Sequence, residues 1–139
     1  RKFITVAAVL AMECEAVILD EPTAGQDLYG IELLHNIIAE LHAQGKTVIT
    51  ITHDIEFAAE NFQRIVVMAH RQILKDGTPE EVFADEPVLN EAMLKGPCSG
   101  RLARRLNLHG EILTNEQFLD AFCRIYERGA SNEVINKEE

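Results

Sequence analysis

Two adjacent carboxylates close a short apolar run in the stretch "VILDEPTAGQD", residues 17–27. Asp20 and Glu21 repel each other electrostatically, and the end of a structural strand does not need them. Their pairing indicates that a cation, or a proton to be removed, lies nearby. One carboxylate can hold magnesium, usually through water, and the second can orient and deprotonate an attacking water. This is chemistry suited to hydrolysis at phosphorus.

A histidine follows a second apolar run, "TVITIT", at residues 47–52. Both runs have the β-branched composition of buried strands, and the single helical pattern between them predicts a right-handed crossover in one parallel sheet. Ligands bind at the carboxyl ends of such strands. We therefore expect Asp20, Glu21 and His53 to face one site, where the imidazole could donate to a charged phosphate.

The elements that must position these residues follow from the hydrophobic pattern and the capping signals. Apolar residues recur at helical spacing from Leu28 to Leu41, and Gly45 suits the end of that helix. Further strands are expected at 16–20, 64–70 and 72–77. A helix is expected at 53–62, with Asp54 near its start, and another begins at Thr78, with Glu81 as its capping-box partner. The last two expected helices are 101–108 and 114–129, the second opened by Thr114 and Gln117. This order predicts an α/β fold with a parallel sheet and flanking helices, an antiparallel edge, and a small helical C-terminal segment.

Composition narrows the class of protein. The chain has 139 residues and a formal net charge of −10, which argues against nucleic acid as a partner. No apolar run approaches the roughly 20 residues that span a bilayer. The three cysteines lie far apart without a Cys-x-x-Cys pair, so neither a disulfide framework nor a zinc site is indicated.

The first residues, "RKFITVAAVLAMEC", have two readings. A basic start and an apolar run resemble a secretory signal peptide. A buried helix interrupted by the start of the sequence is favoured, because Glu13 suits a cleavage site poorly and no linker precedes the next strand. At the other end, residues 130–139 are polar and are expected to fray.

Three motifs together resemble those of ATP-binding-cassette (ABC) ATPases. "AVILDEP" looks like the Walker B motif, "TAGQD" like the D-loop, and "TITHD" like the switch-histidine loop. The resemblance implies a P-loop NTPase, RecA-like fold that binds ATP and Mg²⁺. It implies that Asp20 supports the metal, Glu21 is the general base and His53 contacts the γ-phosphate. Asp27 would belong to the nucleotide-binding set and communicate across a dimer; Gln26 departs from the leucine common at its position.

Two other family motifs do not occur in these residues. There is no Gly-x-x-x-x-Gly-Lys-Ser/Thr phosphate loop and no Leu-Ser-Gly-Gly-Gln signature. By resemblance, the residue after that signature would fall at Arg1. We therefore expect residues 1–86 to be the C-terminal part of a nucleotide-binding domain, and this fragment to be inactive alone. Residues 87–139 would be a helical accessory segment.

The tail carries a more specific likeness. "RLARRL" followed by "LTNEQFLDAF" resembles the C-terminal segment of energy-coupling-factor ATPases, which drive uptake of vitamins or of cobalt and nickel ions. This implies a second ATPase subunit, identical or similar, and an integral-membrane transporter subunit as partners, at the cytoplasmic face of the cell membrane. The alternatives are an import ATPase of another subfamily, a cytosolic ABC-type ATPase of DNA repair or translation, and a non-catalytic interaction module that retains the half-fold.

Overall fold

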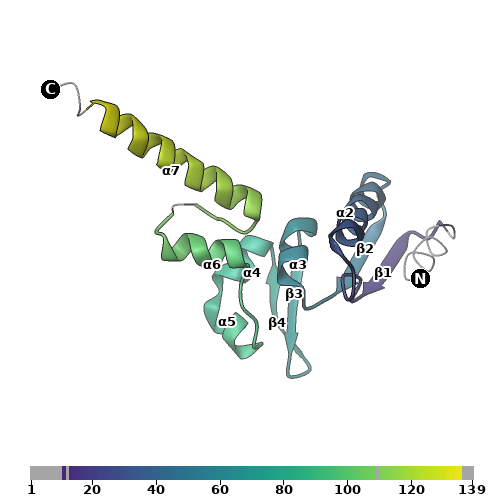
Figure 1. Ribbon diagram of the computed structural model, residues 1–139. Coiled ribbons are helices and arrows are strands. Elements are labelled where there is room, and N and C mark those ends of the chain that lie inside the picture. The colour runs from purple at the N-terminus through teal and green to yellow at the C-terminus, as the bar shows by residue number, and fades with distance from the viewer. Residues whose placement is uncertain (1–10, 12, 109, 136–139) are drawn as a thin grey trace. The chain divides into compact units, whose positions relative to one another are not determined.

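A computed structural model describes residue 11 and residues 13–108 and 110–135 (Figure 1). Packing divides the chain into two compact units, Arg1–Phe57 and Ala58–Glu139, and each is described here by itself. The helix expected near the start of the chain falls on residues that lie outside the described part. The predicted division into a nucleotide-binding domain (1–86) and a helical accessory segment (87–139) stays a prediction.

The first unit is a strand–helix–strand arrangement that leads into a short helix. Its elements are β1 (Ala16–Asp20), α2 (Leu28–Ala43), β2 (Thr47–Ile51) and α3 (Ile55–Asn61), of which the last runs across the boundary between the units. β1 and β2 pair in parallel, with Asp20 opposite Ile51. The predicted parallel pairing of the two strands is thereby confirmed.

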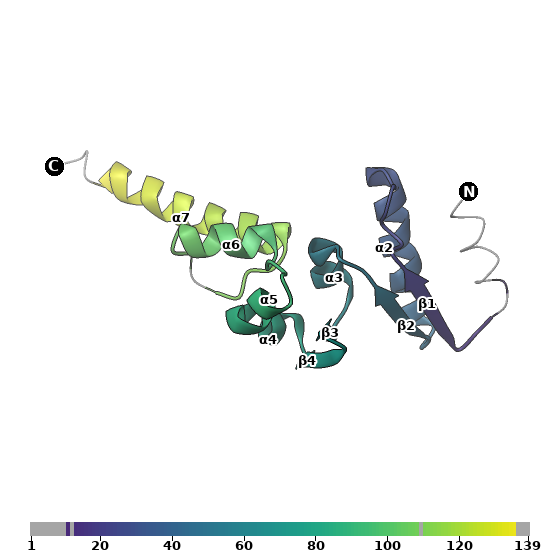
Figure 2. The ribbon, with the colours of Figure 1, turned by 90° about the horizontal axis from the view of Figure 1, so that it is seen from below.

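α2 packs along one face of this pair of strands (Figure 2). Its buried side chains Leu34, Ile38 and Leu41 form the core of the unit with Val17 of β1. Burying such side chains contributes roughly 1.5–3 kcal/mol each. Phe57 of α3 is also buried in this unit.

The opposite face of the strands remains apolar and accessible. Ile18, Ile49 and Ile51 expose 66%, 49% and 58% of their surface. Parallel sheets normally carry cover on both faces, and their strands are accordingly apolar on both sides. Within the described residues this face of the strands has no such cover.

The ends of α2 follow the predicted signals. Asp27 is the N-cap, and its Oδ1 accepts the Gly30 N–H at 2.8 Å. Gly45 adopts a φ of 74°, a left-handed conformation that glycine tolerates without strain. The Gly45 N–H then donates to His42 O and the Lys46 N–H to Leu41 O, which satisfies the last carbonyls of the helix.

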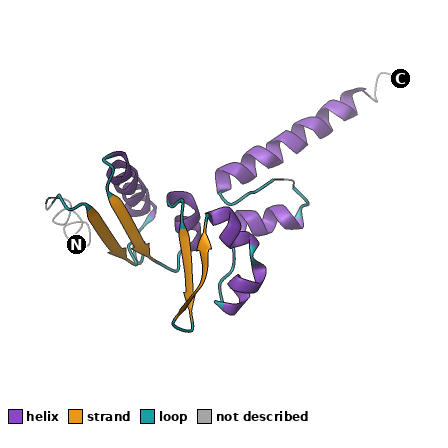
Figure 3. Ribbon diagram, turned by 180° about the vertical axis from the view of Figure 1, so that it is seen from behind, coloured by secondary structure: helices purple, strands orange, loops and turns teal. Residues whose placement is uncertain are grey.

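After the end of α3, the described residues of the second unit form a hairpin and four helices. Its elements are β3 (Ile65–Ala69), β4 (Gln72–Gly77), α4 (Pro79–Ala84), α5 (Glu86–Glu91), α6 (Cys98–Arg105) and α7 (Asn115–Ile135). β3 and β4 are antiparallel and are joined through His70 and Arg71, both at positive φ (Figure 3). A two-residue connection of this kind suits only antiparallel strands.

In the described part of the second unit, β3 and β4 pair only with each other, as an antiparallel two-stranded sheet. The antiparallel direction of these strands is as predicted. That they add an edge to the parallel sheet of the first unit stays a prediction.

Capping chemistry sets the helix starts in this unit. Thr78 and Glu81 form the predicted capping box at α4. α5 was not predicted, although Asp85 caps it by accepting the Val88 N–H at 3.3 Å and Pro87 occupies its first turn. The sequence Asp-Glu-Pro was therefore a helix-start signal, but the short segment after it has too few apolar residues to show a helical period.

α7 begins as predicted and extends further than expected. The Gln117 N–H donates to Thr114 Oγ1 at 3.2 Å, and Gln117 Oε1 accepts the Thr114 N–H at 3.1 Å. The helix continues to Ile135, through part of the segment expected to fray, while residues 136–139 lie outside the described part. Among the described helices, none is long and apolar enough to cross a membrane.

The core of the second unit lies around α4 and α6. Val82 and Phe83 of α4 are almost fully buried. Gly100 of α6 lies so close to the segment after the helix that an added Cβ would sit 2.5 Å from Ile112 O. The buried Ser99 Oγ donates to Leu113 O at 2.8 Å, so α6 and this segment are tied side by side.

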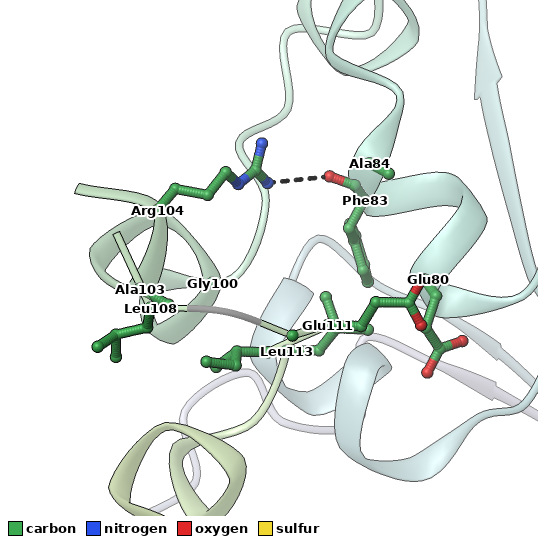
Figure 4. A pocket seen from close by; sticks show the side chains of 11 residues that line it. Glu80, Phe83, Ala84, Gly100, Ala103, Arg104, Leu108, Glu111 and Leu113 are labelled. Atoms are coloured by element: carbon green, nitrogen blue, oxygen red, sulfur yellow. Dashed lines mark hydrogen bonds between the residues drawn. The ribbon is translucent and has the colours of Figure 1, made fainter. Parts of the chain in front are cut away.

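A cavity of about 220 Å³ lies among α4, α6 and residues 110–113 (Figure 4). Phe83 and Leu113 are among its apolar lining residues, and Glu80 and Glu111 bring carboxylates to it. Arg104 donates from Nη2 to Phe83 O at 3.2 Å and pairs through Nη1 with Glu86 at 2.8 Å, tying α6 to α4 and α5.

Candidate functional site

Glu21 stands where β1 ends, in an unusual backbone conformation. Its N–H donates to Ile51 O at 2.8 Å, which extends the ladder between the two strands by one residue. Its φ is 45°, in the left-handed region that a residue with a Cβ rarely adopts. Strain of this kind costs of order 1–3 kcal/mol and clusters at functional sites. The backbone conformation therefore indicates a functional position at Glu21, independently of the charge of its side chain.

The side chain of Glu21 meets the residues that follow β2. Glu21 Oε1 lies 2.8 Å from His53 Nδ1. Its other oxygen, Oε2, accepts the Thr52 hydroxyl at 3.4 Å. Glu21 and His53 therefore meet beyond neighbouring strand ends, as predicted. They do so because parallel pairing in this register brings both strand ends to the same edge.

The carboxylate changes the protonation of the imidazole. The hydrogen bond from Glu21 raises the pKa of His53 above its ordinary value of 6.5, and the negative charge of Glu21 and, more weakly, of Asp54 acts in the same direction. Slight desolvation opposes them. The side chains are 80% exposed for His53 and 37% exposed for Glu21, so solvent screens the pair.

Replacing Glu21 by Gln should lower the pKa of His53 toward 6.5, because the amide keeps the shape but carries no charge. An NMR pH titration of the His53 ring protons measures this. A raised folded pKa means that the pair adds stability below pH 6.5 and loses it as pH rises through the folded value. The control is Glu32→Gln on α2, which should leave the His53 titration unchanged; an equal shift in the control would contradict the assignment.

Asp20 lies beside Glu21 but takes no part in that contact. It lies opposite Ile51 in the strand register and is exposed, and none of the described residues forms a hydrogen bond or ion pair with its side chain. A single accessible carboxylate is a donor that Mg²⁺ accepts, since this ion completes its shell with waters and phosphate oxygens. Asp20 therefore fits the predicted metal role in its chemistry.

Asp27 has a local structural contact instead. Its carboxylate caps α2, and Gln26 lies over the same first turn: a Cβ on Gly30 would come within 2.8 Å of Gln26 Oε1. The structure gives no contact among described residues between Asp27 and the Glu21–His53 pair. The predicted role of Asp27 toward nucleotide and dimer stays a prediction.

Thr52 belongs to the site and was missed from the sequence. Besides donating to Glu21, its Oγ1 accepts the Asp54 N–H at 3.0 Å. Asp54 in turn caps α3 by accepting the Phe57 N–H at 3.0 Å, as its position near the helix start predicted. The sequence signal for Thr52 as a site residue was its hydroxyl, placed between the strand and His53. That signal is weak, because threonine is common in strands.

Comparisons with curated proteins find relatives over most of the chain. It is 40% identical over 110 residues to an energy-coupling factor transporter ATP-binding protein of Methanospirillum hungatei, a match that covers 79% of this chain and 28% of that protein. It is 36% identical over 141 aligned positions to a protein of the same name from Mycoplasmopsis synoviae, covering 99% of this chain and 45% of that protein. The chain thus spans less than half the length of these relatives. No protein-family model matches it.

A solved structure adds a second kind of likeness. CbiO1 from Clostridium perfringens, part of the ABC transporter complex CbiONQ, is 33% identical and aligns with a TM-score of 0.53 over 73% of this chain and 40% of its own. A Methanosarcina acetivorans protein named as a putative ABC transporter ATP-binding protein is 46% identical over 110 residues, which are 79% of this chain and 18% of that protein. Along most of its length the chain is therefore related to the ABC transporter ATP-binding proteins, including those of energy-coupling factor transporters.

Proposed function

We propose that this chain is the C-terminal part of an ATP-hydrolysing subunit of an ABC importer of the energy-coupling-factor type. One observation carries the proposal. Glu21 and His53 meet at 2.8 Å beyond two adjacent parallel strands, in a chain whose relatives are ABC transporter ATP-binding proteins. A carboxylate held by an imidazole at the carboxyl edge of a parallel sheet suits the deprotonation of water beside a phosphate.

Each site residue has a proposed role in that reaction. Glu21 takes the proton from the attacking water, and His53, whose pKa is raised, donates to the γ-phosphate of ATP. Asp20 supports Mg²⁺, which neutralises developing charge on the phosphates when it is bound. Asp27 holds the start of α2 and contributes to communication across a dimer of two such domains.

The exposed strand face supports the proposal that the fold is part of a larger RecA-like domain. Ile18, Ile49 and Ile51 would be covered by further elements of that domain, as both faces of parallel sheets generally are. Residues 1–86 would belong to the nucleotide-binding domain, and residues 87–139 would form an accessory segment built on α6 and α7.

The proposed partners follow from the relatives. We propose that the complete subunit pairs with a second ATPase subunit, identical or similar, and with an integral-membrane transporter subunit at the cytoplasmic face of the membrane. The names of the energy-coupling factor proteins and the CbiONQ complex support this for their own systems.

The cargo would be a vitamin or a transition-metal ion. An ABC ATPase of another subfamily is the second candidate, favoured by the relatives whose names carry no energy-coupling-factor assignment.

The test compares the 139-residue chain with the complete subunit in its transporter. Phosphate release from ATP should be measurable for the complete subunit and should stay at background for the isolated chain, which lacks a phosphate loop in its sequence. The heat-denatured complete subunit provides the background rate. No hydrolysis by the native complete subunit would contradict the proposed function, and equal rates for both would contradict the inactivity of the fragment.

A further inference from the structure

We propose that Thr52 is a positioning residue for the Glu21 carboxylate. The proposal rests on the proposed function, in which Glu21 is the general base. It is carried by the contacts around Glu21, whose two oxygens each have a separate neighbour: His53 Nδ1 at 2.8 Å from Oε1, and Thr52 Oγ1 at 3.4 Å from Oε2. Because each neighbour contacts a different oxygen, the two contacts together restrict rotation of the carboxylate.

The hydroxyl of Thr52 is directed toward Glu21 by its other hydrogen bond. The Asp54 N–H donates to Thr52 Oγ1 at 3.0 Å, so the oxygen acts there as an acceptor. Its single proton is then available for Glu21 Oε2. A β-branched side chain has little χ1 freedom, and Thr52 is half-buried directly after β2, so Oγ1 has a well-defined position.

The contact also anchors Glu21 to a helix start. Asp54 accepts the Phe57 N–H at 3.0 Å, and Phe57 is buried in the core of the first unit. The hydrogen bonds therefore connect the carboxylate, through Thr52 and Asp54, to the first turn of α3. By contrast, His53 is 80% exposed and holds Oε1 from the solvent side.

Thr52 is the contact that remains when His53 turns from Glu21 to another partner. The terminal torsion of glutamate is broad, so a carboxylate held at one oxygen can rotate. When His53 bonds a phosphate rather than Glu21, Thr52 still holds Oε2, whose second lone pair can accept a proton from water. Proton transfer requires the base within hydrogen-bond reach of the water, and a misplacement of about 1 Å can cost as much as about 10²-fold in rate.

Two variants of the complete ATPase subunit test this inference. Thr52→Val keeps the branched shape and removes the hydroxyl, whereas Thr52→Ser keeps the hydroxyl. We expect Val to lower kcat about 10-fold with KM for ATP changed less than about twofold, and Ser to stay within about threefold of wild type. Normal kcat in Val would overturn the inference. An equal loss in Ser and Val with a lowered unfolding temperature would also overturn it, because it would indicate a role in folding alone.

A readout independent of activity is the mobility of the Glu21 side chain. In glutamate-labelled subunit, the two γ-methylene protons of Glu21, assigned by their loss in Glu21→Gln, should be well separated in chemical shift in wild type and Thr52→Ser. Their shifts should move closer together in Thr52→Val, because a mobile side chain samples more rotamers. An unchanged separation in Thr52→Val would count against positioning by the hydroxyl.

The Glu21→Gln background separates this inference from the proposed function. Adding Thr52→Val to Glu21→Gln should cause no further loss, because the two residues act as one unit. If Glu21→Gln retains turnover, the general-base role proposed for Glu21 fails and the inference fails with it, whereas the proposed function fails only if the native complete subunit does not hydrolyse ATP. If Glu21→Gln is inactive and Thr52→Val is normal, the inference alone fails.

Discussion

Replacing Glu21 by Gln in the complete ATPase subunit is expected to lower kcat by roughly 10²–10⁴-fold, the range attributed to general base catalysis. Glutamine keeps the size of the side chain and can still contact Thr52 and His53, but its amide cannot take a proton from water. ATP affinity should be preserved, since the change removes the base without removing a nucleotide contact. Steady-state phosphate release gives kcat, and binding of labelled ATP gives the affinity.

The matched control is Glu32→Gln, an equivalent charge change at an exposed position of α2 that does not contribute to the raised pKa of His53. It should leave both kcat and affinity unchanged. A Glu21→Gln variant that keeps kcat within about tenfold of wild type would lose at most about 1.4 kcal/mol of transition-state stabilisation, too little for a general base. That outcome would refute the assignment of Glu21.

Truncating Phe83 to Ala should destabilise the second unit by about 3–5 kcal/mol, the usual cost of removing a buried aromatic ring. Phe83 is 1% exposed and packs in α4 next to the fully buried Val82. It also lines the cavity among α4, α6 and residues 110–113, so its loss would enlarge that cavity. Amide hydrogen exchange in α4 and α6 reports the free energy of local opening and would measure the loss.

Tyr29→Ala provides the control for that truncation. Tyr29 is also aromatic but 74% exposed on α2, so the change should alter stability by no more than about 0.5 kcal/mol. Comparable losses for the two variants would mean that Phe83 does not carry the packing assigned to it.

Local chemistry predicted most of the elements. The apolar runs gave β1 and β2, and helical spacing with Gly45 gave α2. The capping boxes at Thr78 and Thr114 gave the starts of α4 and α7. These signals act between residues no more than four apart, so they can be recognised in a linear pattern. The exception is α5, whose first turn carries its own cap but whose apolar residues are too few to show a period.

The sequence also predicted that Glu21 and His53 would meet, because parallel strands joined by one helix must end at a common edge. Only the tertiary structure decided the details of that meeting. The left-handed backbone at Glu21 and the hydrogen bond from Thr52 depend on register and on atoms 31 residues apart. Likewise, the register of β3 against β4, with its irregularity between Val67 and Met68, depends on how the two strands meet in space, a property that no short stretch of residues contains.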